Sequence, residues 1–305
     1  MSNVETTTTT RFRKEAMTPS PREEHRKPHP IVNIIMTLLC IAWLLPTIGL
    51  LVSSFRPADA INSTGWWKAF ANPLSATTWT LDNYTQVLSA GQTPMDISFV
   101  NSIVVAVPAT ILPIMIAAFA AYAFTFMQFW GRDTIFIIFV ALLVIPNQVA
   151  LVPLLQFYGQ IGLTGTFPAV WLAHAGFGMP LAVYILRNFM ATLPMSVIES
   201  AKIDGASHFV TFWRLIVPMS VPALASFAIF QFLWVWNDLL VALIFLGQGD
   251  NMVLTVNVKG LLGQQGQGAN LLTAGAFLSM LIPLVVFVSL QRYFVRGMTS
   301  GAVKG

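Results

Sequence analysis

FVNSIVVAVPATILPIMIAAFAAYAFTF, at residues 99–126, contains no charged side chain. A helix rises about 1.5 Å per residue, so roughly 20 apolar residues cross the hydrocarbon core of a bilayer, which is about 30 Å thick. These 28 residues are therefore long enough to form a membrane-spanning helix. Comparable apolar runs lie at 31–53, 134–155, 167–186, 223–246 and 271–294. The sequence predicts an all-α, polytopic membrane protein with six transmembrane helices.

Composition supports the membrane class. Of the 305 residues, 56% are hydrophobic and 9% are charged, whereas a soluble domain carries about 25% charged residues. The net charge is +4, but the basic residues are spread thinly and form no patch interleaved with aromatic residues, so nucleic acid is not an expected partner. Cys40 is the only cysteine, which excludes a disulfide within the chain and a cysteine-cluster metal site.

The distribution of Lys and Arg predicts the orientation, because basic loops are retained in the cytoplasm. With the N-terminus inside, the outer segments hold only Arg56, Lys68 and Lys259. The inner segments hold the other basic residues: Arg11, Arg13, Lys14, Arg22, Arg26, Lys27, Arg132, Arg187, Lys202, Arg214, Arg292, Arg296 and Lys304. We therefore expect a multi-pass protein of a cell membrane with both termini in the cytoplasm.

Three segments outside the spans differ in composition. Residues 1–30 are polar and rich in Thr and Pro, which predicts a disordered cytoplasmic tail before a transmembrane domain at 31–305. The external segment 55–97 contains several Trp and Tyr, while the external segment 247–270 is rich in Gly and Gln. These aromatic residues suit either the membrane interface or a docking surface.

The cytoplasmic segment LPMSVIESAKIDGASHFVTFWRLIVP, residues 193–218, is too polar to span. Ser196 followed by Glu199 has the spacing of a capping box, which predicts an amphipathic helix at about 196–210. Such a helix could rest on lipid headgroups or bind a partner protein.

This segment resembles the motif of ABC importer membrane subunits, Glu-Ala-Ala, three residues, Gly, nine residues, Ile-x-Leu-Pro. The matching residues are Glu199, Ser200, Ala201 and Gly205, followed by Leu215 to Pro218, with the spacing intact and conservative departures at Ser200, Leu215 and Val217. The resemblance implies a coupling helix that docks on an ATPase subunit. The residues that it assigns to ATPase coupling are Glu199, Ser200, Ala201, Asp204, Gly205 and Pro218.

The C-terminal residues 291–305, QRYFVRGMTSGAVKG, are similar to the tail of maltose-type permease subunits. That resemblance implies a second ATPase contact at Gly301, Ala302, Val303, Lys304 and Gly305. WTLDNY at 79–84 and WVWND at 234–238 extend the likeness to carbohydrate-type ABC importer permeases, which have the type I permease fold. SFRP at 54–57 and GWW at 65–67 look like alpha-glucoside-type permeases, so the resemblance suggests a di- or oligosaccharide.

The resemblance also implies the partners and the energy source. They are an ABC ATPase dimer, a second permease subunit, an extracytoplasmic sugar-binding protein and the lipid bilayer of a bacterial cell membrane. The chain has no Gly-x-x-x-x-Gly-Lys-Ser/Thr phosphate loop, so a partner subunit would hydrolyse the ATP. We expect no catalytic residues, no metal and no cofactor bound by this chain, since no HExxH, Cys cluster or GxSxG occurs.

Asp238 is the only acidic residue well inside a predicted span, where an ionisable group suggests function. With Trp234 and Asn237 it offers hydroxyl acceptors beside an aromatic face, which suits a sugar on the substrate path. Two other interpretations remain: Asp238 could fix helix packing through a hydrogen bond. Alternatively, the chain could be a secondary transporter or channel with Asp238 as an ion or proton site.

Overall fold

The computed structural model describes residues 30–75, 77–89, 93–261 and 268–299. Contacts divide the chain into two units, Met1–Thr47 and Ile48–Gly305, with the boundary inside helix α1, Pro30–Ser54. The described part of the first unit is the N-terminal portion of α1. The predicted tail at 1–30 and the predicted contact at 301–305 lie outside the described residues, apart from Pro30, which begins α1.

The second unit is built from helices, and the described residues contain no strand. Its elements after α1 are α2 (Ala58–Ser63), a 3-10 helix (Trp66–Ala71), α3 (Asp82–Ser89), α4 (Met95–Phe126), α5 (Arg132–Leu142), α6 (Asn147–Gln160), α7 (Phe167–Met190), α8 (Met195–Ile203), α9 (His208–Thr211), a π-helical turn (Phe212–Ile216), α10 (Val217–Asn237), α11 (Leu240–Phe245), α12 (Leu254–Gly260) and α13 (Ala269–Thr299). The all-α prediction is confirmed.

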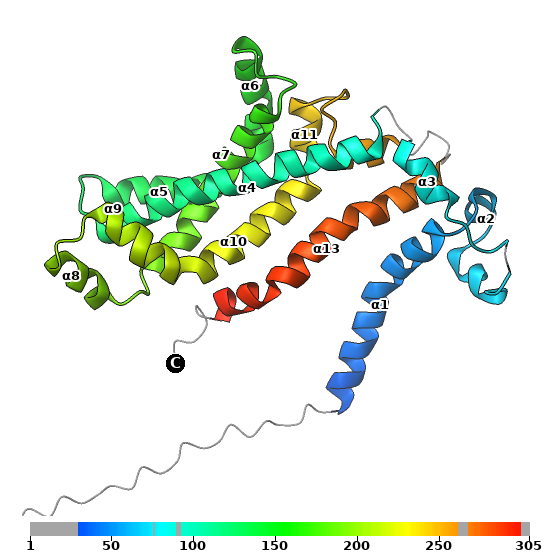
Figure 1. The fold of residues 1–305 in the computed structure, drawn as a ribbon, viewed down its shortest axis with the longest axis horizontal. Coiled ribbons are helices and arrows are strands. Elements are labelled where there is room, and N and C mark those ends of the chain that lie inside the picture. Colours follow the sequence, from blue (N-terminus) through cyan, green and yellow to red (C-terminus); the bar gives the residue numbers. More distant parts are fainter. Residues whose placement is uncertain (1–29, 76, 90–92, 262–267, 300–305) are drawn as a thin grey trace, which may run out of the picture. The chain divides into compact units, whose positions relative to one another are not determined.

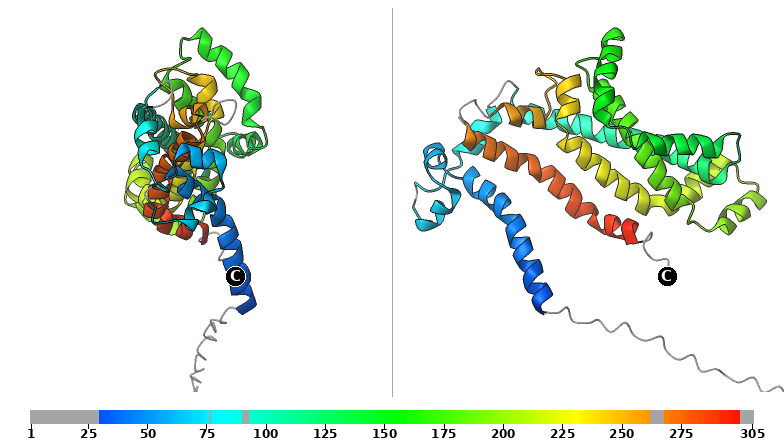
Figure 2. Two further views of the ribbon diagram at one scale, coloured as in Figure 1. Left: turned by 90° about the vertical axis from the view of Figure 1, so that its right-hand side faces the viewer. Right: turned by 180° about the vertical axis from the view of Figure 1, so that it is seen from behind.

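Helices α4, α7, α10 and α13 pack side by side in the second unit (Figures 1 and 2). Helices α4 and α7, which contact each other, both bury small residues, among them Ala106, Ala109 and Ala121 of α4 and Ala169 and Ala182 of α7, all fully buried. Small side chains let helices approach closely in a membrane, where no hydrophobic force drives them together. These four helices form the core of the unit.

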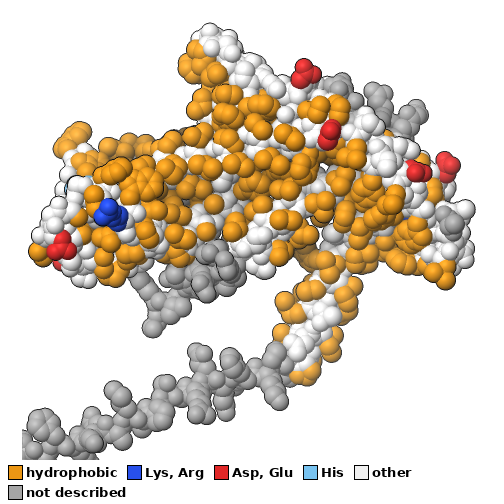
Figure 3. Space-filling model, in the orientation of Figure 1, with side chains coloured by type: hydrophobic (Ala, Val, Ile, Leu, Met, Phe, Trp, Pro, Cys, Tyr) orange, Lys and Arg blue, Asp and Glu red, His pale blue; other side chains and the backbone are white. Residues whose placement is uncertain are grey.

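Among the described residues, five helices are long and apolar enough to cross a membrane, and six if the bent pair α5 and α6 counts as one span. The five are Pro30–Ser54, Met95–Phe126, Phe167–Met190, His208–Asn237 and Ala269–Gln291. Apolar side chains cover most of the visible face of the second unit, on which only a few acidic and basic side chains appear (Figure 3). The predicted polytopic membrane architecture is confirmed.

The third predicted span, 134–155, is not one straight helix. It is divided into α5 and α6, whose axes differ by 98° (Figure 1). Pro146 occupies the N-cap of α6 with an extended ψ of 127°. Proline disfavours helical conformation in the preceding residue and offers no N–H to a continuing helix, which explains the break.

The fifth predicted span, 223–246, also differs from the structure. The helical segment begins earlier, at His208, and runs through the π-helical turn to Asn237. Asp238 has an extended conformation and separates α10 from the short helix α11. The apolar run therefore continues past the point at which the helix ends, and hydropathy alone does not reveal this break.

Candidate functional site

The segment predicted as one coupling helix at 196–210 forms two short helices, α8 and α9. The predicted capping box is wrong: the N-cap of α8 is Pro194, and no side chain caps it. Ser207 is the serine that acts as a cap, because its Oγ accepts a hydrogen bond from the Val210 N–H at the start of α9. Glu199 therefore lies within α8 and does not cap it.

Gly205 terminates α8. Its φ of +78° is in the left-handed region, which favours glycine. The Ala206 N–H donates to the Ala201 carbonyl at 2.9 Å, and the Gly205 N–H donates to the Lys202 carbonyl at 3.0 Å. These two bonds define a Schellman motif, which satisfies carbonyls at the end of a helix. The glycine of the sequence motif is thus required by the local backbone.

The α8–α9 segment presents an exposed face. Glu199, Ser200, Asp204 and Gly205 are exposed, as is Pro218 at the start of α10, whereas Ala201 is buried. Two apolar side chains are also unusually exposed, Ile203 at 85% and Phe209 at 68%. Apart from Gly205 and its two chain neighbours, no described residue has an atom within 4 Å of the position that a Cβ on Gly205 would occupy. The segment offers apolar side chains, a carboxylate and an open glycine to a partner.

The other face of the segment is joined to the helix bundle. Ile198 of α8 is buried in the cluster that also contains residues of α4 and α7. The Tyr122 hydroxyl of α4 lies 2.9 Å from Nδ1 of His208. The rings of Phe119 and Phe212 are stacked with their centroids 4.4 Å apart. A displacement of α8 and α9 would therefore act directly on α4.

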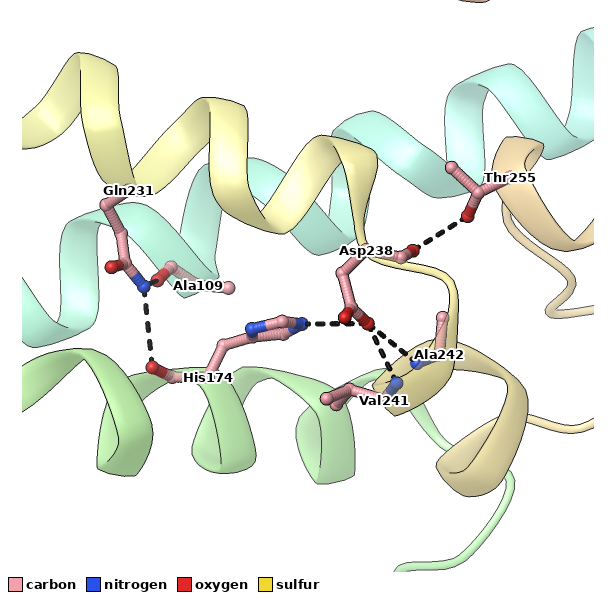
Figure 4. A network of polar contacts seen from close by, with 7 residues as sticks. All are labelled: Ala109, His174, Gln231, Asp238, Val241, Ala242 and Thr255. Carbon is pink, nitrogen blue, oxygen red and sulfur yellow. Dashed lines mark hydrogen bonds and ion pairs between the residues drawn. The ribbon is translucent and has the colours of Figure 1, made fainter. Parts of the chain in front are cut away.

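A second group of polar residues surrounds the break between α10 and α11 (Figure 4). Oδ2 of Asp238 accepts hydrogen bonds from the N–H groups of Val241 at 2.8 Å and Ala242 at 3.3 Å. The Thr255 hydroxyl donates to the Asp238 carbonyl at 2.8 Å. Nε2 of His174 in α7 lies 3.8 Å from Oδ2 of Asp238. The carboxylate thus satisfies the first turn of α11 and faces a histidine.

The three residues predicted for the substrate path have different surroundings. Trp234 lines a pocket of about 230 Å³ together with Asn147, Gly178, Phe230 and Gln231. Asn237 is exposed, and its amide donates to the Leu233 carbonyl at 2.7 Å within its own helix. Asp238 lines a different and much smaller cavity, of about 10 Å³, beside His174. Trp234 and Asp238 line different cavities, but both lie against His174, whose ring centroid is 5.1 Å from that of Trp234.

The sequence reasoning missed His174 and Gln231, which are 1% and 0% exposed inside apolar helices. The Gln231 amide donates to the carbonyls of Ala109 at 3.2 Å and His174 at 3.4 Å, and so connects α10 to α4 and α7 (Figure 4). Gly178 makes room for it, because a Cβ there would lie 2.6 Å from Oε1 of Gln231. A polar residue within an apolar run was the signal that could have identified both.

The predicted outer segments are folded onto the bundle. Asn101 of α4 donates to the carbonyls of Asp250 and Met252 at 2.9 and 3.0 Å, and Asn257 donates to the Thr93 carbonyl at 2.8 Å. These bonds fix the described part of the 247–270 segment against the start of α4.

Arg56 organises the segment after α1. Its guanidinium donates to the carbonyls of Ala60 at 2.9 Å and Thr64 at 3.2 Å. Burial lowers the pKa of Arg56 from its ordinary value. The side-chain amide of Asn83 in α3 donates to the Arg56 carbonyl at 2.7 Å, so this segment is also tied to α3.

Comparison with known proteins identifies the family. Residues 114–300 match the family model described as binding-protein-dependent transport system inner membrane component. The chain is 53% identical to the osmoprotective compounds uptake permease protein GgtD of Synechocystis sp., over 90% of this chain and 91% of that protein. It is 40% identical to the alpha-glucoside transport system permease protein AglG of Rhizobium meliloti, over 90% of this chain and 97% of that protein.

Solved structures confirm the predicted permease fold. A chain of a bacterial alginate ABC transporter, solved in complex with an alginate pentasaccharide-bound periplasmic protein, matches with a TM-score of 0.59 at 16% identity. The match covers 85% of this chain and 92% of that chain. The sequence and fold comparisons agree, and the chain belongs to the family of inner membrane components of binding-protein-dependent transport systems.

Proposed function

We propose that this chain is one of two permease subunits of an ATP-driven sugar importer and that an ATPase dimer docks on the α8–α9 segment. The observation that carries the proposal is the exposed, Schellman-terminated α8, which buries Ile198 against the bundle and is followed by α9, whose His208 contacts Tyr122 of α4. Ile203 and Phe209 supply apolar area to the ATPase, and Glu199 supplies a charge for a basic residue. The tail residues Gly301 to Gly305 would add the second ATPase contact.

The energy source follows from this assignment. The partner ATPase hydrolyses the ATP, and the chain itself binds no cofactor and catalyses no reaction. Closure of the ATPase dimer would move α8 and α9, and the Tyr122–His208 and Phe119–Phe212 contacts would transmit that movement to α4. Both termini, α8 and α9 lie in the cytoplasm in this arrangement, in agreement with the distribution of basic residues.

The proposed substrate is an α-linked di- or oligosaccharide delivered by an extracytoplasmic binding protein. Several similar permeases carry names of such sugars, including alpha-glucoside, trehalose, and melibiose, raffinose and stachyose. The pocket beside Trp234 combines an indole ring with the Asn147 amide, which suits a sugar because its faces are apolar and its rim carries hydroxyl groups. We therefore assign Trp234 to the substrate path and regard Asp238 as a packing residue.

The alternative, a secondary transporter with Asp238 as an ion site, has less support. The N–H groups of Val241 and Ala242, in the first turn of α11, already donate hydrogen bonds to the Asp238 carboxylate. A protonation or ion-binding cycle at this residue would disturb those bonds.

The test is purification of the tagged chain from its own host, followed by uptake of labelled disaccharides into vesicles. We expect an ATPase and a second permease to co-purify, and uptake to require ATP and the binding protein. Purification of the chain alone, together with uptake driven by an ion gradient without ATP, would contradict the proposal.

A further inference from the structure

The ends of α4 and α7, the starts of α5 and α8 and the connection between α7 and α8 border an open pocket of about 220 Å³ that the transport function does not explain. It is lined by Phe124, Thr125, Phe126, Arg132, Arg187, Ala191, Leu193 and Met195. The orientation predicted from the basic residues places this end of the helices in the cytoplasm. Two guanidinium groups therefore line one pocket at the predicted inner surface of the membrane.

Arg187 is incompletely paired. Its Nε is buried and has no hydrogen-bond partner among the described residues. Its remaining contacts are a long bond from Nη1 to the Asn188 side chain at 3.4 Å and a position 4.7 Å above the ring of Phe136. No carboxylate lies within 4.0 Å of it in the described part of the chain. The Phe136 ring fixes the plane of the guanidinium without neutralising its charge.

Arg132 has one acidic neighbour. Its Nε lies 3.0 Å from Oδ1 of Asp133, an exposed carboxylate, and its Nη1 makes a long contact of 3.5 Å with the Met127 carbonyl. Arg132 is therefore the arginine that interacts with a carbonyl just after the end of α4, where positive charge is favourable. Arg187 makes no hydrogen bond of this kind among the described residues. The pair carries more positive charge than its described partners neutralise.

The size and position of the pocket indicate its ligand. The pocket volume of about 220 Å³ is several times the volume of one water molecule, about 30 Å³. The pocket can therefore hold a polar group larger than a water molecule. Guanidinium groups match phosphate oxygens through paired hydrogen bonds. Trp130, which is 97% exposed, lies between α4 and α5, where a membrane-interface aromatic residue is expected. One turn into α5, Ile135 and Ile138 are exposed and could contact an acyl chain.

We propose that the pocket lined by Arg132 and Arg187 binds the phosphate of an anionic phospholipid of the inner leaflet. Basic pockets between helices on the cytoplasmic side suit such headgroups, because anionic lipids are concentrated there. The bound lipid would join the α4–α5 connection to the end of α7 and the start of α8. It would thereby stabilise the part of the helix bundle against which the α8–α9 segment packs. The inference is independent of which solute the chain transports.

The experiment measures retention of phosphatidylglycerol and phosphatidylcholine by the intact purified transporter complex, using native mass spectrometry with lipid titration. Each basic contact contributes about 1 kcal/mol near an anionic surface, which is about a fivefold change in affinity. We expect Arg132→Gln with Arg187→Gln to weaken phosphatidylglycerol binding about 25-fold and to leave phosphatidylcholine unaffected. Arg132→Gln alone, which keeps the Arg187–Phe136 contact, should weaken it about fivefold. This single variant tests the proposal if the double variant does not fold.

Arg214→Gln is the matched control, because Arg214 is an exposed arginine on the same predicted side that does not line the pocket. It should leave lipid binding unchanged. A separate titration with inorganic phosphate identifies the source of the ligand. Competition by phosphate as effective as by phosphatidylglycerol would overturn the lipid assignment in favour of a soluble anion. Unchanged phosphatidylglycerol binding in the arginine variants would show that the pocket is not the lipid site. Loss of the ATPase from those variants without loss of lipid would indicate that the pocket is a protein contact instead.

Discussion

Substitutions at Gly205 separate backbone strain from side-chain bulk, because the two effects predict opposite orders for Ala and Asn. Beyond its two chain neighbours, a Cβ at this position would meet no atom of the described residues within 4 Å, so steric clash with them does not contribute. The φ of +78° remains unfavourable for any residue with a Cβ. Asn tolerates this left-handed conformation better than Ala, although Asn is larger.

The expected magnitude follows from the conformation. Left-handed backbone costs an L-residue about 1–2 kcal/mol, which corresponds to a factor of about 5–30 in the population of the correctly terminated helix. We therefore expect Gly205→Ala to reduce ATP-dependent uptake and ATPase association by up to that factor. Gly205→Asn should have a smaller effect, and Gly205→Val the largest, because β-branched residues are rare at positive φ.

The assay compares ATPase co-purification and ATP-dependent uptake into vesicles at equal amounts of folded permease. Gly162 provides a matched control, since its φ is +71° and its Cβ position is also open. It lies between α6 and α7, on the predicted outer side, so Gly162→Ala should introduce similar strain and leave ATPase association intact. If Gly205→Asn is as harmful as Gly205→Ala, or worse, the strain reasoning is refuted and close approach by the ATPase explains the glycine.

Three further predictions concern the helix bundle. Asp238→Asn keeps an acceptor for the N–H groups of α11 and should retain sugar uptake. Asp238→Leu leaves those N–H groups unpaired, which costs about 1–3 kcal/mol of stability for each group, and should reduce uptake. Loss of uptake in both variants would favour an ion site. Gly178→Ala should lower the free energy of unfolding by about 1–3 kcal/mol in thermal denaturation, because it displaces Gln231, and Gln231→Ala in the same chain should relieve part of that loss. His208→Phe and Tyr122→Phe each remove the same hydrogen bond, so each should lower uptake per ATP hydrolysed. The double variant should resemble either single variant. Additive losses would show that the two residues do not act through this hydrogen bond.

The two faces of the α8–α9 segment have different roles in these predictions. The outer face, with Ile203 and Phe209, binds the partner in our proposal, while the inner face, with Ile198 and His208, contacts the bundle. A variant on the outer face should release the ATPase. A variant on the inner face should leave the ATPase bound but less able to drive uptake.

Local sequence signals predicted most of the architecture. Charge-free runs such as 99–126 required spanning helices, because a bilayer cannot hydrate an exposed backbone. The motif at Glu199 and Gly205 identified the α8 segment, and the family comparison confirmed the resemblance. The sequence did not reveal that Ser207, and not Ser196, is the serine that caps a helix. Both serines have plausible spacing, and the choice depends on where the preceding helix ends.

The sequence by itself determined that this chain lies in a membrane, roughly which segments cross it, and which loop carries the family motif. Hydropathy and a glycine-dependent turn act over a few residues, so they can be recognised along the chain. Only the tertiary structure decided that Gln231 connects three helices and that Trp234 and Asp238 line different cavities on either side of His174. These features depend on which helix faces pack together. An apolar run of nearly uniform hydropathy carries little information about which of its faces will contact a neighbouring helix.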